Sequence, residues 1–198
     1  MSRPVSIGLA ALLTGLAGAA LAEDHPPLLP TRDVAVTYNV TARQANAPHE
    51  AHLFYSAATQ NIRLELGQQI YTIVDRAAHR VTVVVPQQQM YTVSPFSPSM
   101  SPGVLLNDRM HFVRKGTDTV AGQPCTNWDV TGDRGSGTAC VTADGVLLRV
   151  EGRDHDGNNA GLLATAVSYA AQPASLFEPP ADFHKMDMPA AMPPQAPK

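Results

Sequence analysis

The residues best suited to bind a metal lie near the C-terminal end, where histidine and methionine side chains cluster. His184, Met186 and Met188 stand at alternate positions of the chain. Imidazole and thioether groups are soft ligands of the kind that bind copper. Prolines at 189, 193 and 194 interrupt this segment. We therefore treat a periplasmic copper binder as the least favoured of the functions considered below.

Two other motifs resemble catalytic or metal-binding signatures but lack their spacing. Gly135-Ser136-Gly137 does not have the G-x-S-x-G pattern of a nucleophile elbow, which also requires a strand before it and a helix after it. The run from Asp154 to Asn159 places its glycine at the fourth position, whereas a calcium loop needs it at the sixth. We predict no catalytic residues, no cofactor and a protein that is not an enzyme.

Cys125 and Cys140 are the two cysteines of the chain. A zinc site would need further cysteines or closely spaced histidines, and neither is near them. An isolated pair in a small exported domain usually forms a disulfide. The closed loop of about 15 residues would contribute roughly 3 kcal/mol to stability.

The first 22 residues have the three parts of a secretory signal peptide. Arg3 supplies the positive charge, residues 7–16 are apolar, and the small residues at 19–22 suit a signal peptidase. The apolar run is shorter than the roughly 20 residues that span a bilayer. We therefore expect a periplasmic protein without stable membrane insertion.

The charge balance argues against two classes of partner. The chain has 14 basic and 17 acidic side chains, and loss of Arg3 with the signal peptide leaves 13 against 17, or −4. A mildly acidic surface disfavours nucleic acid and anionic membranes.

The remaining chain is predicted to form one β-rich domain over 33–188. It follows an extended lead-in at 23–32 and precedes a Pro/Ala-rich tail at 189–198, which we expect to be disordered. Alternating apolar residues and short turns predict an antiparallel meander. The predicted strands are 33–43, 52–57, 61–66, 69–75, 79–85, 89–94, 124–131, 138–143, 146–153 and 162–170.

The strongest turn signal is Asp144-Gly145, a pair typical of a type I′ hairpin. A two-residue turn there pairs residue 143 with 146, 141 with 148, and 139 with 150, all of them apolar. Cys140 would then point to the opposite side, beside Arg149 and Glu151. The disulfide should therefore clamp the outer face of the sheet.

Between the two groups of strands, the pattern changes. Residues 94–103 contain three Ser-Pro pairs, which predict a loop across the rim of the sheet. Leu106, Met110 and Val113 have helical spacing, so we predict a short helix over 104–113, with one more strand as the alternative. Loop and helix together would form a lid over the sheet.

The order of these features resembles a group of largely uncharacterised bacterial periplasmic proteins whose fold is similar to that of the LolA/LolB lipoprotein carriers. The resemblance covers about residues 31–188 and rests on the segments RDVAVTY (32–38), YTIVD (71–75), MYTV (90–93), TVAG (119–122), ACVTADGVLLR (139–149) and LFEPP (176–180). It implies a curved antiparallel sheet that forms an incomplete barrel, with one or two short helices or loops plugging the concave side. In carriers of that type the cavity accepts acyl chains.

We therefore predict a non-enzymatic periplasmic binding module with a hydrophobic cavity for lipid, acyl chains or another apolar ligand. A lipid or a lipidated protein would be its partner. An alternative is a cell-envelope structural or interaction protein that binds no small molecule. The residues expected to line the cavity are the apolar and aromatic members of the early strands: Val36, Tyr38, Tyr55, Leu64, Tyr71, Ile73 and Tyr91.

Overall fold

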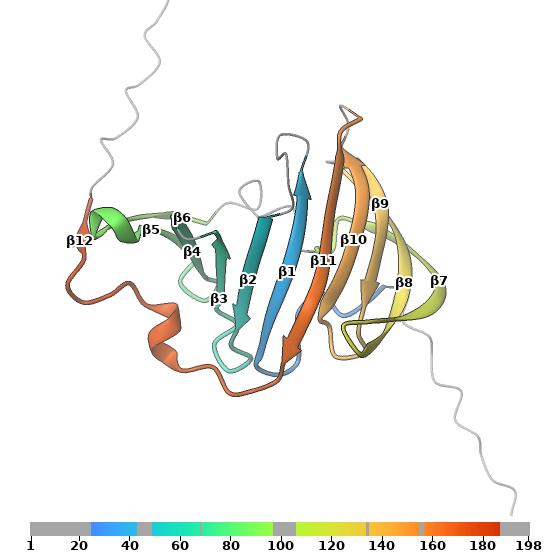
Figure 1. Ribbon diagram of the computed structural model, residues 1–198, viewed down its shortest axis with the longest axis horizontal. Helices are drawn as coiled ribbons and strands as arrows, with labels where there is room; N and C mark the ends of the chain where they lie inside the picture. The colour runs from blue at the N-terminus through green and yellow to red at the C-terminus, as the bar shows by residue number, and fades with distance from the viewer. Residues whose placement is uncertain are drawn as a thin grey trace, which may run out of the picture.

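The computed structural model of the chain describes residues 25–42, 49–67, 69–96, 106–133, 135–154 and 157–186. The predicted signal peptide (1–22), the tail (189–198) and most of the Ser-Pro loop lie outside these residues. Within them, the strands form one twelve-stranded sheet that is curved and not closed (Figure 1). The predicted mainly β fold, an open curved antiparallel sheet, is confirmed.

Two meanders make up this sheet, and β1 lies between them. The order across the sheet is β12-β6-β5-β4-β3-β2-β1-β11-β10-β9-β8-β7. Within each meander, β1–β6 and β7–β11, consecutive strands lie side by side. β1 also pairs with β11, which follows it by more than a hundred residues and so joins the two meanders. The strands are β1 (Val34–Ala42), β2 (His49–Tyr55), β3 (Ile62–Leu66), β4 (Ile70–Asp75), β5 (Arg80–Val85), β6 (Met90–Pro95), β7 (His111–Val120), β8 (Gln123–Gly132), β9 (Gly135–Val141), β10 (Leu147–Asp154), β11 (Asn159–Ser168) and β12 (His184–Lys185).

The predicted helix over 104–113 is wrong for the residues that the structure describes there. Residues 106–110 are irregular chain and a turn, and β7 begins at His111. Phe112 is buried while Val113 is exposed. Neighbouring residues of a strand point to opposite faces of the sheet, so one can be buried while the next is exposed. Aromatic and β-branched residues such as these two also favour strands. The strand alternative therefore holds from His111 onward.

Helical structure in the described residues is limited to two 3-10 turns, η1 (Pro86–Gln88) and η3 (Ala174–Phe177). No helix of the described chain has the length and apolar character needed to cross a membrane.

The hairpin at Asp144-Gly145 forms, but its turn is longer than predicted. The Gly145 N–H donates to the Thr142 carbonyl at 3.1 Å, and the Thr142 N–H donates to the Val146 carbonyl at 2.9 Å. Gly145 has a φ of 88°, whereas Asp144 is not among the described residues with positive φ, as a type I′ turn would require. The longer turn shifts the pairing by one residue, and a bulge between Leu147 and Arg149 restores the predicted register beyond it. The predicted pairs 143/146 and 141/148 are therefore wrong.

Beyond the bulge the predicted register is confirmed, since Val150 pairs with Ala139 and Arg149 with Cys140. Cys125 and Cys140 form the predicted disulfide, with their Cα atoms 5.5 Å apart. As predicted, Cys140 lies beside Arg149, on the side of the sheet opposite Ala139 and Val150. Both cysteines are buried on that side, where they belong to the largest hydrophobic cluster. Val120, at the tip of the β7–β8 hairpin, belongs to the same cluster and helps to cover it.

The disulfide should make a measurable contribution to stability. We expect the Cys125→Ala/Cys140→Ala variant to unfold with a free energy lower by about 3 kcal/mol, because the unfolded chain regains the loop entropy that the bridge removes. Urea denaturation of the variant and the oxidised protein measures this difference. Reduction of the wild-type protein should cause a similar loss and leave the variant unchanged; equal stability of all three would contradict the prediction.

Candidate binding groove

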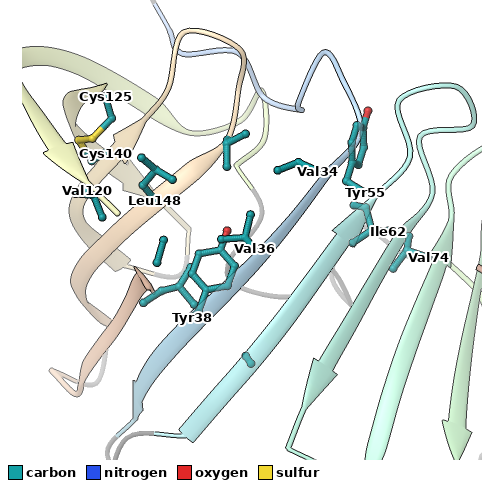
Figure 2. Close-up of a cluster of buried hydrophobic side chains, with 14 of the residues drawn as sticks. Val34, Val36, Tyr38, Tyr55, Ile62, Val74, Val120, Cys125, Cys140 and Leu148 are labelled. Atoms are coloured by element: carbon teal, nitrogen blue, oxygen red, sulfur yellow. A yellow bond between two sulfur atoms is a disulfide. The ribbon is translucent and has the colours of Figure 1, made fainter. Parts of the chain in front are cut away.

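The cavity residues predicted from the sequence divide between the two faces of the sheet. We call the face of β1 that carries Val34, Val36 and Tyr38 the inner face, and the opposite one the outer face. Tyr55 lies opposite Val34 across β1 and β2, and Leu64 continues the row of Val36 through Leu53. Val36, Tyr38, Tyr55 and Leu64 therefore all lie on the inner face, and Figure 2 shows the side chains of the first three in one buried cluster.

Tyr71, Ile73 and Tyr91 lie on the outer face. Tyr71 and Ile73 are buried against Phe177, and Tyr91 packs on the same cluster. We call residues 171–186, which cross this face after β11, the strap (Figure 1). Because the strap covers these residues, they do not line a common cavity with Tyr38.

The strap is also held by polar contacts. Arg63 pairs with Glu65 at 2.6 Å, donates to the Leu176 carbonyl at 3.0 Å and lies 3.7 Å over the Tyr71 ring. Burial raises the pKa of the Tyr71 phenol, and the charge of Arg63 opposes this effect only in part. At its end the strap adds β12 beside β6, with His184 N–H donating to the Gln89 carbonyl at 2.8 Å.

Around β1 to β3 the inner face is filled by its own side chains. The remaining gap has a volume of about 40 Å³, whereas small-molecule sites occupy roughly 300–1,000 Å³. The Tyr38 hydroxyl donates to the Leu147 carbonyl at 2.7 Å, and burial raises the pKa of this phenol. Tyr38 is thus a packing residue that links β1 to β10.

An open groove lies farther along the inner face, over β8, β9 and β10. Its volume is about 290 Å³. Ala160, Gly152 and Gly137 stand side by side across β11, β10 and β9, and these positions have little or no side chain to fill the space. The other lining residues are mostly apolar: Leu106, Met110, Val130, Gly132, Gly135, Ser136, Thr138, Ala139, Val150 and Arg153.

Gly137 and Gly152 are required by the close approach of their strands. A Cβ atom on Gly137 would lie 2.3 Å from the Glu151 carbonyl oxygen, and one on Gly152 would lie 2.7 Å from that of Ser136. Ser136, between Gly135 and Gly137, lies within β9. The backbone geometry therefore keeps this part of the sheet free of side chains.

The lead-in lies on the inner face beside the groove. Leu28, Leu29 and Pro30 line the 40 Å³ gap together with Leu106, which also lines the groove. Pro26 is fully buried, and the His25 ring lies 6.4 Å from that of Phe112. The lead-in thus occupies the boundary between the filled and the open parts of this face.

Polar contacts around Asp144 hold the lead-in in place. Arg32 pairs with the Asp144 carboxylate at 2.7 Å and lies 3.5 Å over the Tyr169 ring, and the Thr31 N–H donates to the Asp144 carbonyl at 2.9 Å. Burial raises the pKa of the Asp144 carboxyl, but the hydrogen bond from Thr142 and the pairing with Arg32 outweigh it and hold that pKa below its usual value.

Two further features resemble binding sites. A polar hollow of about 590 Å³ lies at the ends of β2, β3 and β4. Its lining includes His49, His52 and Glu65, yet no group of three or more histidine, cysteine or acidic side chains in the described chain is placed to hold a metal. His184 and Met186 are exposed in and after β12, and Met188 lies outside the described residues.

Sequence reasoning missed the groove because it searched for large apolar residues. The signal was nevertheless present in the predicted hairpin. The pairing of residue 139 with 150 also places residue 137 opposite 152, and both are glycines. A pair of glycines on one face of a strand pair marks a position with no side chain to fill it.

No protein-family model and no curated protein matches the sequence. The likeness to known proteins therefore lies in the arrangement of strands, an open and strongly curved antiparallel sheet.

Several solved structures share this architecture. An uncharacterized conserved protein from Thermus thermophilus aligns with a TM-score of 0.56 and 13% identity, over 79% of this chain and 90% of that one. A chain in the structure of the Pseudomonas aeruginosa MucA/MucB complex aligns with a TM-score of 0.51 and 13% identity, over 82% of this chain and 62% of that one. At such identities the likeness is one of fold.

A domain from Vibrio parahaemolyticus assigned to outer membrane lipoprotein sorting matches 70% of this chain and 85% of its own length at 10% identity. Its TM-score of 0.34 carries no argument about function.

The docking of the lead-in can be tested at Gly145. A Cβ atom there would lie 2.2 Å from the Leu29 carbonyl oxygen, in addition to the strain of a positive φ. Gly122 has a similar φ of 74° but no atom within 4 Å of such a Cβ, so it is a matched control. We expect Gly122→Ala to lower the free energy of unfolding by about 1 kcal/mol, and Gly145→Ala by at least about 1 kcal/mol more. Equal losses in urea denaturation would show that the lead-in does not pack on this turn.

Proposed function

We propose that this protein is an exported, non-enzymatic binding module whose groove takes an apolar chain, such as the acyl chain of a lipid or of a lipidated protein. The observation that carries the proposal is the groove of about 290 Å³ between apolar walls, over a floor of small residues. Its volume is close to the lower end of the range for small-molecule sites, roughly 300 Å³. A slender chain suits this shape better than a bulky ring system.

The chemistry of the lining supports an apolar ligand. Met110, Val130 and Val150 offer aliphatic and thioether surface, and Arg153 at the rim is the charged side chain among the described lining residues. Removing an apolar chain from water gives about 0.8 kcal/mol per buried methylene. The Arg153 side chain lies on the face opposite Gly152 and donates to Asn159 at 3.0 Å, which leaves the described lining of the groove itself without a charged group.

The proposed location is the periplasm. The Cys125–Cys140 disulfide supports it, because such bonds persist in oxidising compartments. The signal-peptide pattern of residues 1–22 supports the same location on sequence grounds.

A second candidate function is that of an envelope interaction protein. The ten-residue strand β7 ends the sheet, and most of its residues are exposed. An edge strand of this length can pair with an extended segment of another protein. The solved MucA/MucB structure, a complex of two proteins, is in keeping with such a role for this fold.

The proposal predicts that blocking the groove abolishes binding without unfolding the protein. Ala160 is exposed and lines the groove, so Ala160→Phe would place a ring over its small-residue floor. Ala166 lies on the same strand, is also exposed and faces outward with Thr37, so Ala166→Phe is the control. We expect wild type and Ala166→Phe to take up a fluorescent fatty acid equally, and Ala160→Phe to bind at least about tenfold more weakly, the equivalent of nearly two buried methylenes.

Native mass spectrometry of the protein purified from its own periplasm provides an independent test. Lipid that co-purifies with the wild type but not with Ala160→Phe would support binding in the groove. An apo mass together with no uptake of the fluorescent fatty acid by the wild type would overturn the lipid proposal and favour the interaction protein.

A further inference from the structure

The groove ends where the lead-in begins. Leu106 lines both the groove and the 40 Å³ gap, so the two spaces are neighbours on the inner face. Leu28 packs against the hydrophobic cluster of Trp128 and Ala139, which underlies the groove, while Leu29 packs against the cluster of Tyr38 on the filled side. The two leucines therefore stand at the junction of the open and filled parts.

The gap behind these leucines is apolar on every described side. Besides the lead-in, it is lined by residues of five strands and of the Gly145 hairpin: Val34, Tyr38, Leu53, Tyr55, Ile62, Leu64, Gly145, Val146, Leu147 and Leu162. Its small volume is due in part to the two leucine side chains. Without them the groove would continue toward β1 and β3 along apolar surface.

The lead-in is attached differently from the rest of the inner-face core. Residues 25–33 belong to no strand of the sheet. Their C-terminal part is held by the Asp144 carbonyl and carboxylate, which accept from Thr31 and Arg32. It is also held by the Asp33 carboxylate, which accepts from the N–H groups of Ala57 and Gln172. The lead-in is thus an added segment laid across one end of the groove, held at the Gly145 turn.

We propose that Leu28 and Leu29 are the specificity-determining residues of this site: they form its end wall and set the longest apolar chain that it can bury. The inference rests on the proposed function, since it assumes that the groove binds an apolar chain. Each additional methylene of a ligand strengthens binding by roughly fourfold as long as it is buried. That gain stops at the chain length at which the ligand reaches Leu28.

The test is the chain-length dependence of binding by the full exported protein. Fatty acids from octanoate to stearate displace a fluorescent fatty acid, and their affinities are compared between wild type and Leu28→Ala/Leu29→Ala. We expect affinity to rise with chain length in both proteins, and to level off at a longer chain in the variant. Leu176→Ala, which removes the same kind of side chain from the strap on the outer face, should keep the wild-type profile.

The outcomes separate the two proposals. If the wild type binds no fatty acid, the proposed function fails. If both proteins bind fatty acids and their affinities level off at the same chain length, Leu28 and Leu29 are not the end wall, although the groove still binds an apolar chain. Should the double variant not fold, Arg32→Gln is used instead, because it removes only the exposed contacts to Asp144 and Tyr169. With the lead-in loosened, affinity should again level off at a longer fatty-acid chain than in the wild type. The same dependence on chain length as in the wild type would overturn the end wall.

Discussion

The pairing of β1 with both β2 and β11 is the constraint on which the rest of the structure depends. β1 is the strand that joins the two meanders, so the inner face is continuous only while both of its registers hold. A slip of one residue would turn Val34, Val36 and Tyr38 to the outer face. The hydrogen bond from Tyr38 to the Leu147 carbonyl reaches past β11 to β10 and thereby helps to fix the curvature between the halves.

Much of this fold could be predicted from the sequence, because alternation and turn residues act locally. The predicted strands reappear with boundaries shifted by a few residues, and the disulfide and the 139/150 pairing are confirmed. The helix over 104–113 was wrong because three apolar residues at helical spacing also fit a turn followed by a strand. The Asp144-Gly145 turn was mistaken in type because Thr142 closes a longer loop with its own backbone and side chain.

The assignment of residues to faces was less predictable. β4 has apolar side chains at both odd and even positions, so alternation does not say whether Tyr71 or Val74 faces inward. What decides is the strap, whose Phe177 covers Tyr71 from a position more than a hundred residues later. Such a contact leaves no local trace in the sequence. The groove was missed for a different reason. It lies where the strands carry glycine and alanine, so large apolar residues do not mark its position.

Both faces of the sheet are covered by terminal segments, but by different physical means. On the outer face, Phe177 is itself a buried member of a cluster with Tyr71, Ile73 and Val84, and β12 adds backbone hydrogen bonds. Displacing the strap would expose that cluster and an unpaired strand edge together. On the inner face, the lead-in adds one fully buried residue, Pro26, half-buried leucines and polar contacts at one turn, while the strands beneath it remain fully paired. A ligand competing with the protein's own segments therefore meets the lower resistance at the lead-in, next to the groove.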